Sequence, residues 1–185
     1  NVIKYCILRG ANASATGGVV VFNTSVSTGN NNNIIEHNYI SSVVTSTTPH
    51  NAIYATANNG IPNQGNVIRN NYIHNYTNRG VFIATNNNNT TITGNHFYQT
   101  TTRSITAAHA AIFIDNASGS GMNITNNYIG GSDTACGGVS PMNISGAQLI
   151  QMIYFSANNN SSHQITGNVL ANMNLTTTST TANHA

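Results

Sequence analysis

One short motif recurs six times along this 185-residue chain, and the repetition constrains the fold more than any other feature of the sequence. Two clear copies read NIIEHNYI at 33–40 and NVIRNNYI at 66–73. Looser copies begin at residues 1, 90, 122 and 163, so the intervals between copies are 32, 33, 24, 32 and 41 residues. Self-similarity at intervals of about 20 to 50 residues is typical of proteins built from stacked repeats.

Between these copies lies a second recurring segment of β-branched and aromatic residues, such as GVFIA at 80–84. Each repeat therefore contains two short strands separated by polar turns, and no segment has a helical period with caps. An immunoglobulin-like sandwich also has many short strands, but its segments need not resemble one another. We predict an all-β fold, a parallel β-helix of about five to six coils, with 1–185 as one domain or a fragment of a longer solenoid.

The motif also predicts which residues stack. Equivalent residues of successive coils should lie about 4.8 Å apart. One inward column would contain Ile3, Ile35, Ile68, Ile92, Ile124 and Ile165. A column of buried amides beside it would contain Asn38, Asn71, Asn95, Asn127 and Asn168, with Cys6 interrupting it at one end. Buried amides need partners, so we expect an asparagine ladder that bonds along the axis.

These residues resemble the right-handed parallel β-helices of the pectin lyase-like superfamily, with repeats of the PbH1 or NosD type. The resemblance covers nearly the whole chain and implies a right-handed solenoid. It is a poor guide to function, because the superfamily includes lyases, hydrolases, epimerases, phage tailspikes and adhesins. The charge-poor, Asn- and Thr-rich composition is similar to that of bacterial surface β-helix proteins, which implies a secreted or cell-surface location.

Composition excludes several functions. Only 4% of residues are charged, whereas Asn, Thr and Ser make up 74 of 185. A net charge of +2 gives no basic stripe for nucleic acid, and no apolar run is long enough to span a membrane. The Asn-rich runs resemble disordered low-complexity sequence, but the 39% hydrophobic content follows the repeat. No signal peptide opens the chain, so we expect a mature segment or a fragment.

Three outward columns are candidates for function. Lys4, Glu36 and Arg69 alternate in charge and predict an ion ladder, with a general base at Glu36 as the alternative. An aromatic column could stack on sugars or pack against itself, and consists of Tyr39, Tyr72, His96 and Tyr128. An apolar column would need a cover, and is predicted from Val20, Ile53, Phe82, Phe113 and Ile153.

The loops at 41–50, 98–109 and 130–148 should meet at one edge, where four residues are candidates for catalysis: His50, Arg79, Arg103 and His109. A lyase needs a base and cations to neutralise an acidic substrate, which these residue types could provide. The only carboxylates are Glu36, Asp115 and Asp133, too few for a calcium site or for hydrolysis by clustered acids. No metal-ligand spacing occurs, and Cys6 and Cys136 should lie too far apart to pair.

From these features we expect no cofactor and no metal, and a structural role at the cell surface, as a filament subunit or adhesin stalk. The alternative is a carbohydrate-active β-helix, either a polysaccharide lyase or a glycan-binding module. An ice-binding protein is a lesser alternative, because Thr93, Thr125 and Thr166 align on one face. The expected partners are copies of the chain or flanking solenoid coils, stacked end to end, and a polysaccharide under the alternative.

Overall fold

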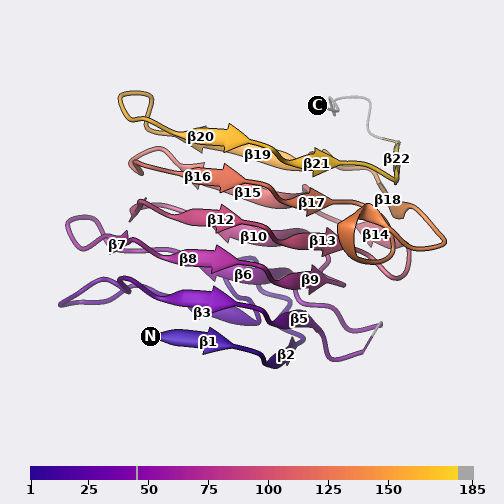
Figure 1. Ribbon diagram of the computed structural model, residues 1–185, viewed down its shortest axis with the longest axis horizontal. Coiled ribbons are helices and arrows are strands. Elements are labelled where there is room, and N and C mark those ends of the chain that lie inside the picture. Colours follow the sequence, from indigo (N-terminus) through magenta and orange to yellow (C-terminus); the bar gives the residue numbers. More distant parts are fainter. Residues whose placement is uncertain (45, 179–185) are drawn as a thin grey trace.

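The computed structural model describes residues 1–44 and 46–178, and over these residues the chain is all-β (Figure 1). Short strands form five sheets, and every pair of strands in these sheets is parallel. A single turn of 3-10 helix, η1 (Thr134–Cys136), is the only helix in the described part. The strands lie in layers, one above the other, from the N-terminus to β20 (Figure 1).

Two six-stranded sheets contain the two halves of the repeated motif. The first sheet consists, in order, of β1 (Val2–Lys4), β4 (Ile34–Glu36), β8 (Val67–Arg69), β12 (Thr91–Thr93), β16 (Asn123–Thr125) and β20 (Gln164–Thr166). The second consists of β2 (Ile7–Gly10), β5 (Tyr39–Ser42), β9 (Tyr72–His74), β13 (His96–Tyr98), β17 (Tyr128–Ile129) and β21 (Val169–Leu170). Strand order follows chain order, so each layer lies directly on the preceding one.

The remaining strands form one larger and two smaller sheets. The third sheet has the order β19 (Ile153–Ala157), β15 (Ala110–Asn116), β10 (Arg79–Ile83), β6 (Asn51–Ala55) and β3 (Val20–Phe22). A three-stranded sheet pairs β14 (Arg103–Ile105), β18 (Met142–Gly146) and β22 (Met173–Thr177). A two-stranded sheet pairs β7 (Asn63–Gln64) with β11 (Asn87–Asn88). The predicted loops at 98–109 and 130–148 therefore each contain a strand.

The register of the first two sheets confirms the predicted inward columns. Ile3 pairs with Ile35, Ile35 with Ile68, and so on to Ile165. Ile35 and Ile68 are buried, and they belong to one hydrophobic core that runs through the layers between the sheets. Parallel sheets buried on one face need such continuous columns of β-branched residues, because each inward side chain lies on its equivalent one layer below.

The turn between the first and second sheets has the same backbone in every layer. The residue before each ladder position has a positive φ, between 54° and 66°, at Tyr5, His37, Asn70, Gly94, Asn126 and Gly167. Glycine and asparagine enter this left-handed region at little cost, whereas tyrosine and histidine do not. We call this two-residue turn the ladder corner. The segments that lead from the second sheet to the third, 11–19, 43–50, 75–78, 99–109 and 130–152, form the loop corner.

The predicted apolar column on the third sheet is wrong in register. Val20 pairs with Ile53, and Ile53 pairs with Val81, not with Phe82. They continue to Ile112 and Ile153, and this column faces the core. The outward column instead contains Val21, Tyr54, Phe82, Phe113 and Tyr154. The prediction aligned the segments at 80–84 and 111–115 one residue too late. Because side chains alternate along a strand, it therefore combined residues that face the core with residues that face outward.

Candidate functional site

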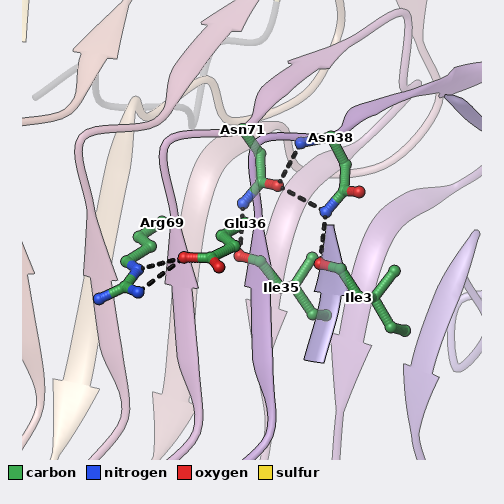
Figure 2. Close-up of polar contacts among 6 residues, drawn as sticks. All are labelled: Ile3, Ile35, Glu36, Asn38, Arg69 and Asn71. Atoms are coloured by element: carbon green, nitrogen blue, oxygen red, sulfur yellow. Dashed lines mark hydrogen bonds and ion pairs between the residues drawn. The ribbon is translucent and has the colours of Figure 1, made fainter. Parts of the chain in front are cut away.

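The ladder asparagines bond to one another through the layers (Figure 2). The backbone N–H and the Nδ2 of Asn38 both donate to Oδ1 of Asn71, each at 3.0 Å. The Nδ2 of Asn71 donates to the carbonyl of Ile35 at 2.8 Å and to Oδ1 of Asn95 at 3.0 Å. The same pattern continues from Asn95 through Asn127 to Asn168. At the other end the N–H of Cys6 donates to Asn38, but its thiol offers no amide oxygen.

The charged column on the outer face of the first sheet contains one ion pair. A guanidinium nitrogen of Arg69 lies 2.6 Å from Oε2 of Glu36, and Nε donates to the same oxygen at 2.7 Å (Figure 2). Lys4 is in register with Glu36, but its Nζ lies 5.7 Å from the centroid of the Tyr5 ring. The carboxylate of Glu36 is thus held by Arg69, which favours a structural role over that of a general base.

The aromatic residues of the second sheet form a continuous stack. Ring centroids are 4.6 Å apart between Tyr39 and Tyr72, 5.3 Å between Tyr72 and His96, and 4.9 Å between His96 and Tyr128. The angles between ring planes are 29°, 33° and 8°. The faces of the inner rings are therefore covered by their neighbours. Stacking on a sugar needs an open ring face, so this column favours packing within the sheet.

A loop lies against the same stack. The backbone N–H of Ala135 donates to Nδ1 of His96 at 2.7 Å, and burial lowers the pKa of His96. Ala135 and Cys136 both have positive φ, 52° and 59°, although neither is glycine. The N–H of Ala135 needs an unprotonated Nδ1, so it fixes His96 as the tautomer protonated at Nε2.

Two of the four catalytic candidates lie together on the third sheet. Asn51, which follows His50, pairs with Arg79, and the N–H of Arg79 donates to the carbonyl of His50 at 3.0 Å. The Arg79 guanidinium lies 4.5 Å from the centroid of Phe82 and 4.3 Å from that of Phe113. Its Nε is buried without a hydrogen-bond partner among the described residues. Burial lowers the pKa of His50, and the nearby charge of Arg79 lowers it further.

Arg103 is 7% exposed and lies in the loop corner. Its Nε donates to Oε1 of Gln99 at 2.9 Å, and a terminal nitrogen donates to Oδ1 of Asn75 at 3.0 Å. Gln99 in turn donates to the carbonyl of Tyr76 at 3.0 Å. This buried guanidinium ties together segments of two layers, and burial lowers its pKa. Its position favours a structural role over contact with a substrate.

His109 is also enclosed, with 1% of its surface exposed. Its ring stacks on Tyr76 at 5.5 Å, and its Nδ1 donates to the carbonyl of Thr77 at 2.8 Å. Its Nε2 is buried without a partner in the described part of the chain, as is the hydroxyl of Tyr76. Burial lowers the pKa of His109 to about 4 and raises that of Tyr76. His109 is therefore enclosed and precedes Ala110, which pairs with Arg79, whereas Arg103 bonds to Gln99 and Asn75.

One polar cluster escaped the sequence analysis. Arg9 and His74 line a common pocket on the second sheet, with Ser41, Ser42 and Asn75. These residues come from three segments that lie more than 30 residues apart in the sequence, and none stands out from the many polar residues of the chain. The available signal was the register itself, which assigns Arg9 and Ser41 to the same outward column.

Neither family models, nor curated proteins, nor solved structures show a match to this chain. Across residues 1–44 and 46–178, no group of three or more His, Cys, Asp or Glu side chains could hold a metal ion. In the same residues, no helix has the length and apolar character needed to cross a bilayer. Cys6 and Cys136 are both free thiols. What the site can do must therefore be argued from its own geometry.

Proposed function

We propose that the chain is a right-handed parallel β-helix of the pectin lyase-like kind with a structural role outside the cell, as a filament subunit or adhesin stalk. The parallel pairing of equivalent strands in all six layers supports a solenoid. Crossover connections between parallel strands of one sheet are right-handed in nearly all proteins, which supports the handedness.

One observation supports the structural role. Side chains that could recognise a ligand instead contact the equivalent side chains of the next layer. The rings of Tyr72 and His96 cover each other, Arg69 holds Glu36, and the asparagine amides bond along the stack. The asparagine bonds and the ring stack continue from layer to layer, so they stabilise length rather than a pocket. A surface with few charges and many amides suits a rigid extracellular rod.

The partners that fit this role are flanking solenoid layers or copies of the chain. The first and last layers expose motif positions that inner layers bury: Ile3 is 39% and Ile165 44% exposed, whereas Ile35 is fully buried. Burying apolar surface contributes about 25 cal/mol per Å², so a further layer would stabilise either face. A further layer with asparagine at the ladder position could accept hydrogen bonds from the N–H and Nδ2 of Asn168. A copy of the chain stacked on this end would place Cys6 there, and cysteine has no amide oxygen to accept them.

The second candidate is a carbohydrate-active β-helix, and it is supported by Arg79 and His50. A cation beside a histidine that burial keeps neutral provides the two groups that a lyase acting on an acidic sugar needs. Ice binding has less support, because Thr93 and Thr125 bond to each other at 2.9 Å within a column of only three threonines.

Two measurements test the proposal. Electron microscopy of the chain, with the flanking sequence of its gene, should reveal rods or filaments, and incubation with uronic-acid polymers should produce no absorbance from unsaturated products. Product formation that is lost in Arg79→Ala but kept in Arg69→Ala would replace the structural role with the lyase. A compact monomer with no flanking solenoid sequence would also contradict it.

A further inference from the structure

One of the five Lys and Arg residues of the chain, Arg9, lies beside His74 on the outer face of the second sheet. Arg9 on β2 pairs in register with Ser41 on β5. His74 on β9 follows Ile73, which pairs with Ile40. Side chains alternate along a strand, so Arg9, Ser41 and His74 belong to one outward column over three layers.

These three residues line a pocket together with Ser42, Asn75 and two valines. Its volume is about 190 Å³, several times the roughly 30 Å³ that one water molecule occupies in the liquid. The lining is rich in hydrogen-bond donors, since it combines a guanidinium, two hydroxyls and an imidazole. The only full charge among these groups at neutral pH is positive. A pocket of this composition suits a small anion better than an apolar ligand.

Two groups in the pocket lack a protein partner for their charge or hydrogen bond. Arg9 is exposed and forms no ion pair with a carboxylate of the residues that the structure describes. Within the same residues, Nδ1 of His74 is buried and has no hydrogen-bond partner. The imidazole is held in place by stacking on Tyr98, with centroids 4.7 Å apart and planes at 10°. A buried polar atom without a partner is costly, so a ligand that bonds to it gains that free energy.

The surrounding charges make the site positive. Burial, Arg103 and Arg9, in that order, lower the pKa of His74 to about 4, and Asp133 partly opposes them. These are the charged groups that face His74 from β14, β2 and the loop before η1, and Tyr98 is the titratable group on β13. At neutral pH His74 is therefore uncharged, and its tautomer protonated at Nδ1 can donate a hydrogen bond.

We propose that the pocket lined by Arg9, Ser41, Ser42 and His74 binds a small oxyanion, either free or as an ester group on a polymer. The Arg9 guanidinium presents paired N–H groups that match the oxygens of a sulfate, phosphate or carboxylate. The Ser42 hydroxyl and the imidazole N–H supply further donors, whereas the Ser41 hydroxyl donates to the carbonyl of Ser42 at 3.3 Å. The proposal does not depend on the structural role, because a rod can carry such a site on its face.

The test follows the His74 ring by NMR while sodium sulfate replaces sodium chloride at constant ionic strength. The wild-type resonance should move along a saturating curve, and the bound anion should raise the pKa of His74. Arg9→Gln should weaken the binding at least about tenfold. Lys4→Gln is the matched control, because it removes an exposed cation from the same layer outside the pocket and should leave the binding unchanged.

A second variant protects the test against a folding defect in Arg9→Gln. Ser42→Ala removes one donor and should weaken sulfate binding several-fold, with an unchanged near-ultraviolet circular dichroism spectrum. Equal weakening by Lys4→Gln and Arg9→Gln would reveal general charge screening and would overturn the proposal. So would the absence of any saturating shift of His74 up to molar sulfate.

Two polymers distinguish the sources of the oxyanion. Dextran sulfate should bind more tightly per sulfate than the free ion if the natural ligand is polymeric, and uncharged dextran should not bind. Equal affinity per sulfate identifies a free ion as the ligand, and the pocket stands in both cases. Dextran sulfate binding that survives Arg9→Gln together with Ser42→Ala would refute the pocket.

Discussion

The ladder corner and the loop corner of each layer solve the same problem, reversing the chain, in opposite ways. The ladder corner takes two residues in every layer, and its asparagines use one another as partners. The loop corner ranges from 75–78 to 130–152, and there Arg103 bonds to the non-equivalent residues Gln99 and Asn75. The repeated ladder corner stabilises the fold with the same contact in each layer. The variable loop corner contains the buried side chains of Arg103 and His109 and contributes one wall of the pocket at Arg9.

The largest effect should come from breaking the ladder corner. Asn71→Leu removes the acceptor of the N–H and Nδ2 of Asn38 and the donor to the carbonyl of Ile35. Each buried group left without a partner costs about 1–3 kcal/mol, so we expect a loss of roughly 4 kcal/mol or more. Thermal unfolding should detect it as a fall of about 10 °C or more in melting temperature.

The control is Asn59→Leu, at an exposed turn residue with no hydrogen bond of its side chain within the described part of the chain. It should change the melting temperature by no more than about 2 °C. Equal melting temperatures for the two variants would mean that the ladder contributes nothing to stability.

The next effect concerns acid and the loop corner. His109 has a pKa of about 4 when folded and an ordinary value of 6.5 when unfolded, so the unfolded chain binds more protons between these values. The contribution of His109 to the free energy of unfolding is at its maximum above pH 6.5. It falls as the pH drops from 6.5 to 4 and does not change further below pH 4. His109 contributes about 1.4 kcal/mol per pH unit to the slope across that window, in addition to a similar contribution from His74, whose folded pKa is also about 4. Urea denaturation at each pH measures the total slope.

His109→Gln should reduce the slope by about 1.4 kcal/mol per pH unit and leave the contribution of His74, because glutamine can still donate to the carbonyl of Thr77 without titrating. Asn59→Leu replaces an exposed residue that does not titrate, so it should leave the slope unchanged. A wild-type curve that is flat between pH 6.5 and 4 would contradict the burial of a neutral His109.

The next prediction compares the loss of stability when an arginine is replaced in the loop corner, at Arg103, and on the outer face of the first sheet, at Arg69. Arg103→Met leaves Oδ1 of Asn75 and Oε1 of Gln99 without this buried donor, at a cost of about 2 kcal/mol. Arg69→Met breaks an ion pair whose arginine side chain is 43% exposed, at a cost of about 0.2–1 kcal/mol. Urea midpoints of the two variants measure the difference, and the reverse order would refute the structural role of Arg103.

The smallest effect should be a gain in stability at the ladder corner. His37 has a φ of 54° at a position where the four following layers have asparagine or glycine. His37→Asn relieves part of that strain and should stabilise the fold by a few tenths of a kcal/mol, up to about 1. Gly94→Ala should do the opposite, because its Cβ would collide with Oδ1 of Asn70. Melting temperatures that move in the same direction would contradict a shared backbone at this turn.

Sequence reasoning succeeded where the repeat is strict. The register of the isoleucine column followed from the motif. Every layer contains the same eight-residue motif, so aligning the copies pairs each isoleucine with the isoleucine of the next layer. It failed on the third sheet, where Arg79 rather than Gly80 pairs with Asn51. Gly80 faces the core, where a Cβ would lie 2.6 Å from Cδ1 of Phe97. The need for glycine at this position depends on a contact with a residue of another sheet, which the local sequence does not reveal.

The candidate residues divide in the same way. The amide and aromatic columns were predictable because equivalent positions in parallel layers must stack. The burial of Arg103 and His109 was not, since it depends on loops of unequal length that contribute partners such as Gln99 and Tyr76. The pocket at Arg9 and His74 was missed for a related reason: its donors are ordinary residues until the register assembles them.

The stacked rings of the second sheet also give the protein an optical property. The chain contains no tryptophan, so its near-ultraviolet absorption and emission belong to tyrosine, with a small share from phenylalanine. Tyr39 and Tyr72 lie 4.6 Å apart, close enough for their electronic transitions to couple. The coupled signal exists only while adjacent layers remain in register. The circular dichroism of the tyrosine band is therefore an intrinsic, label-free gauge of whether neighbouring layers separate one at a time or all at once.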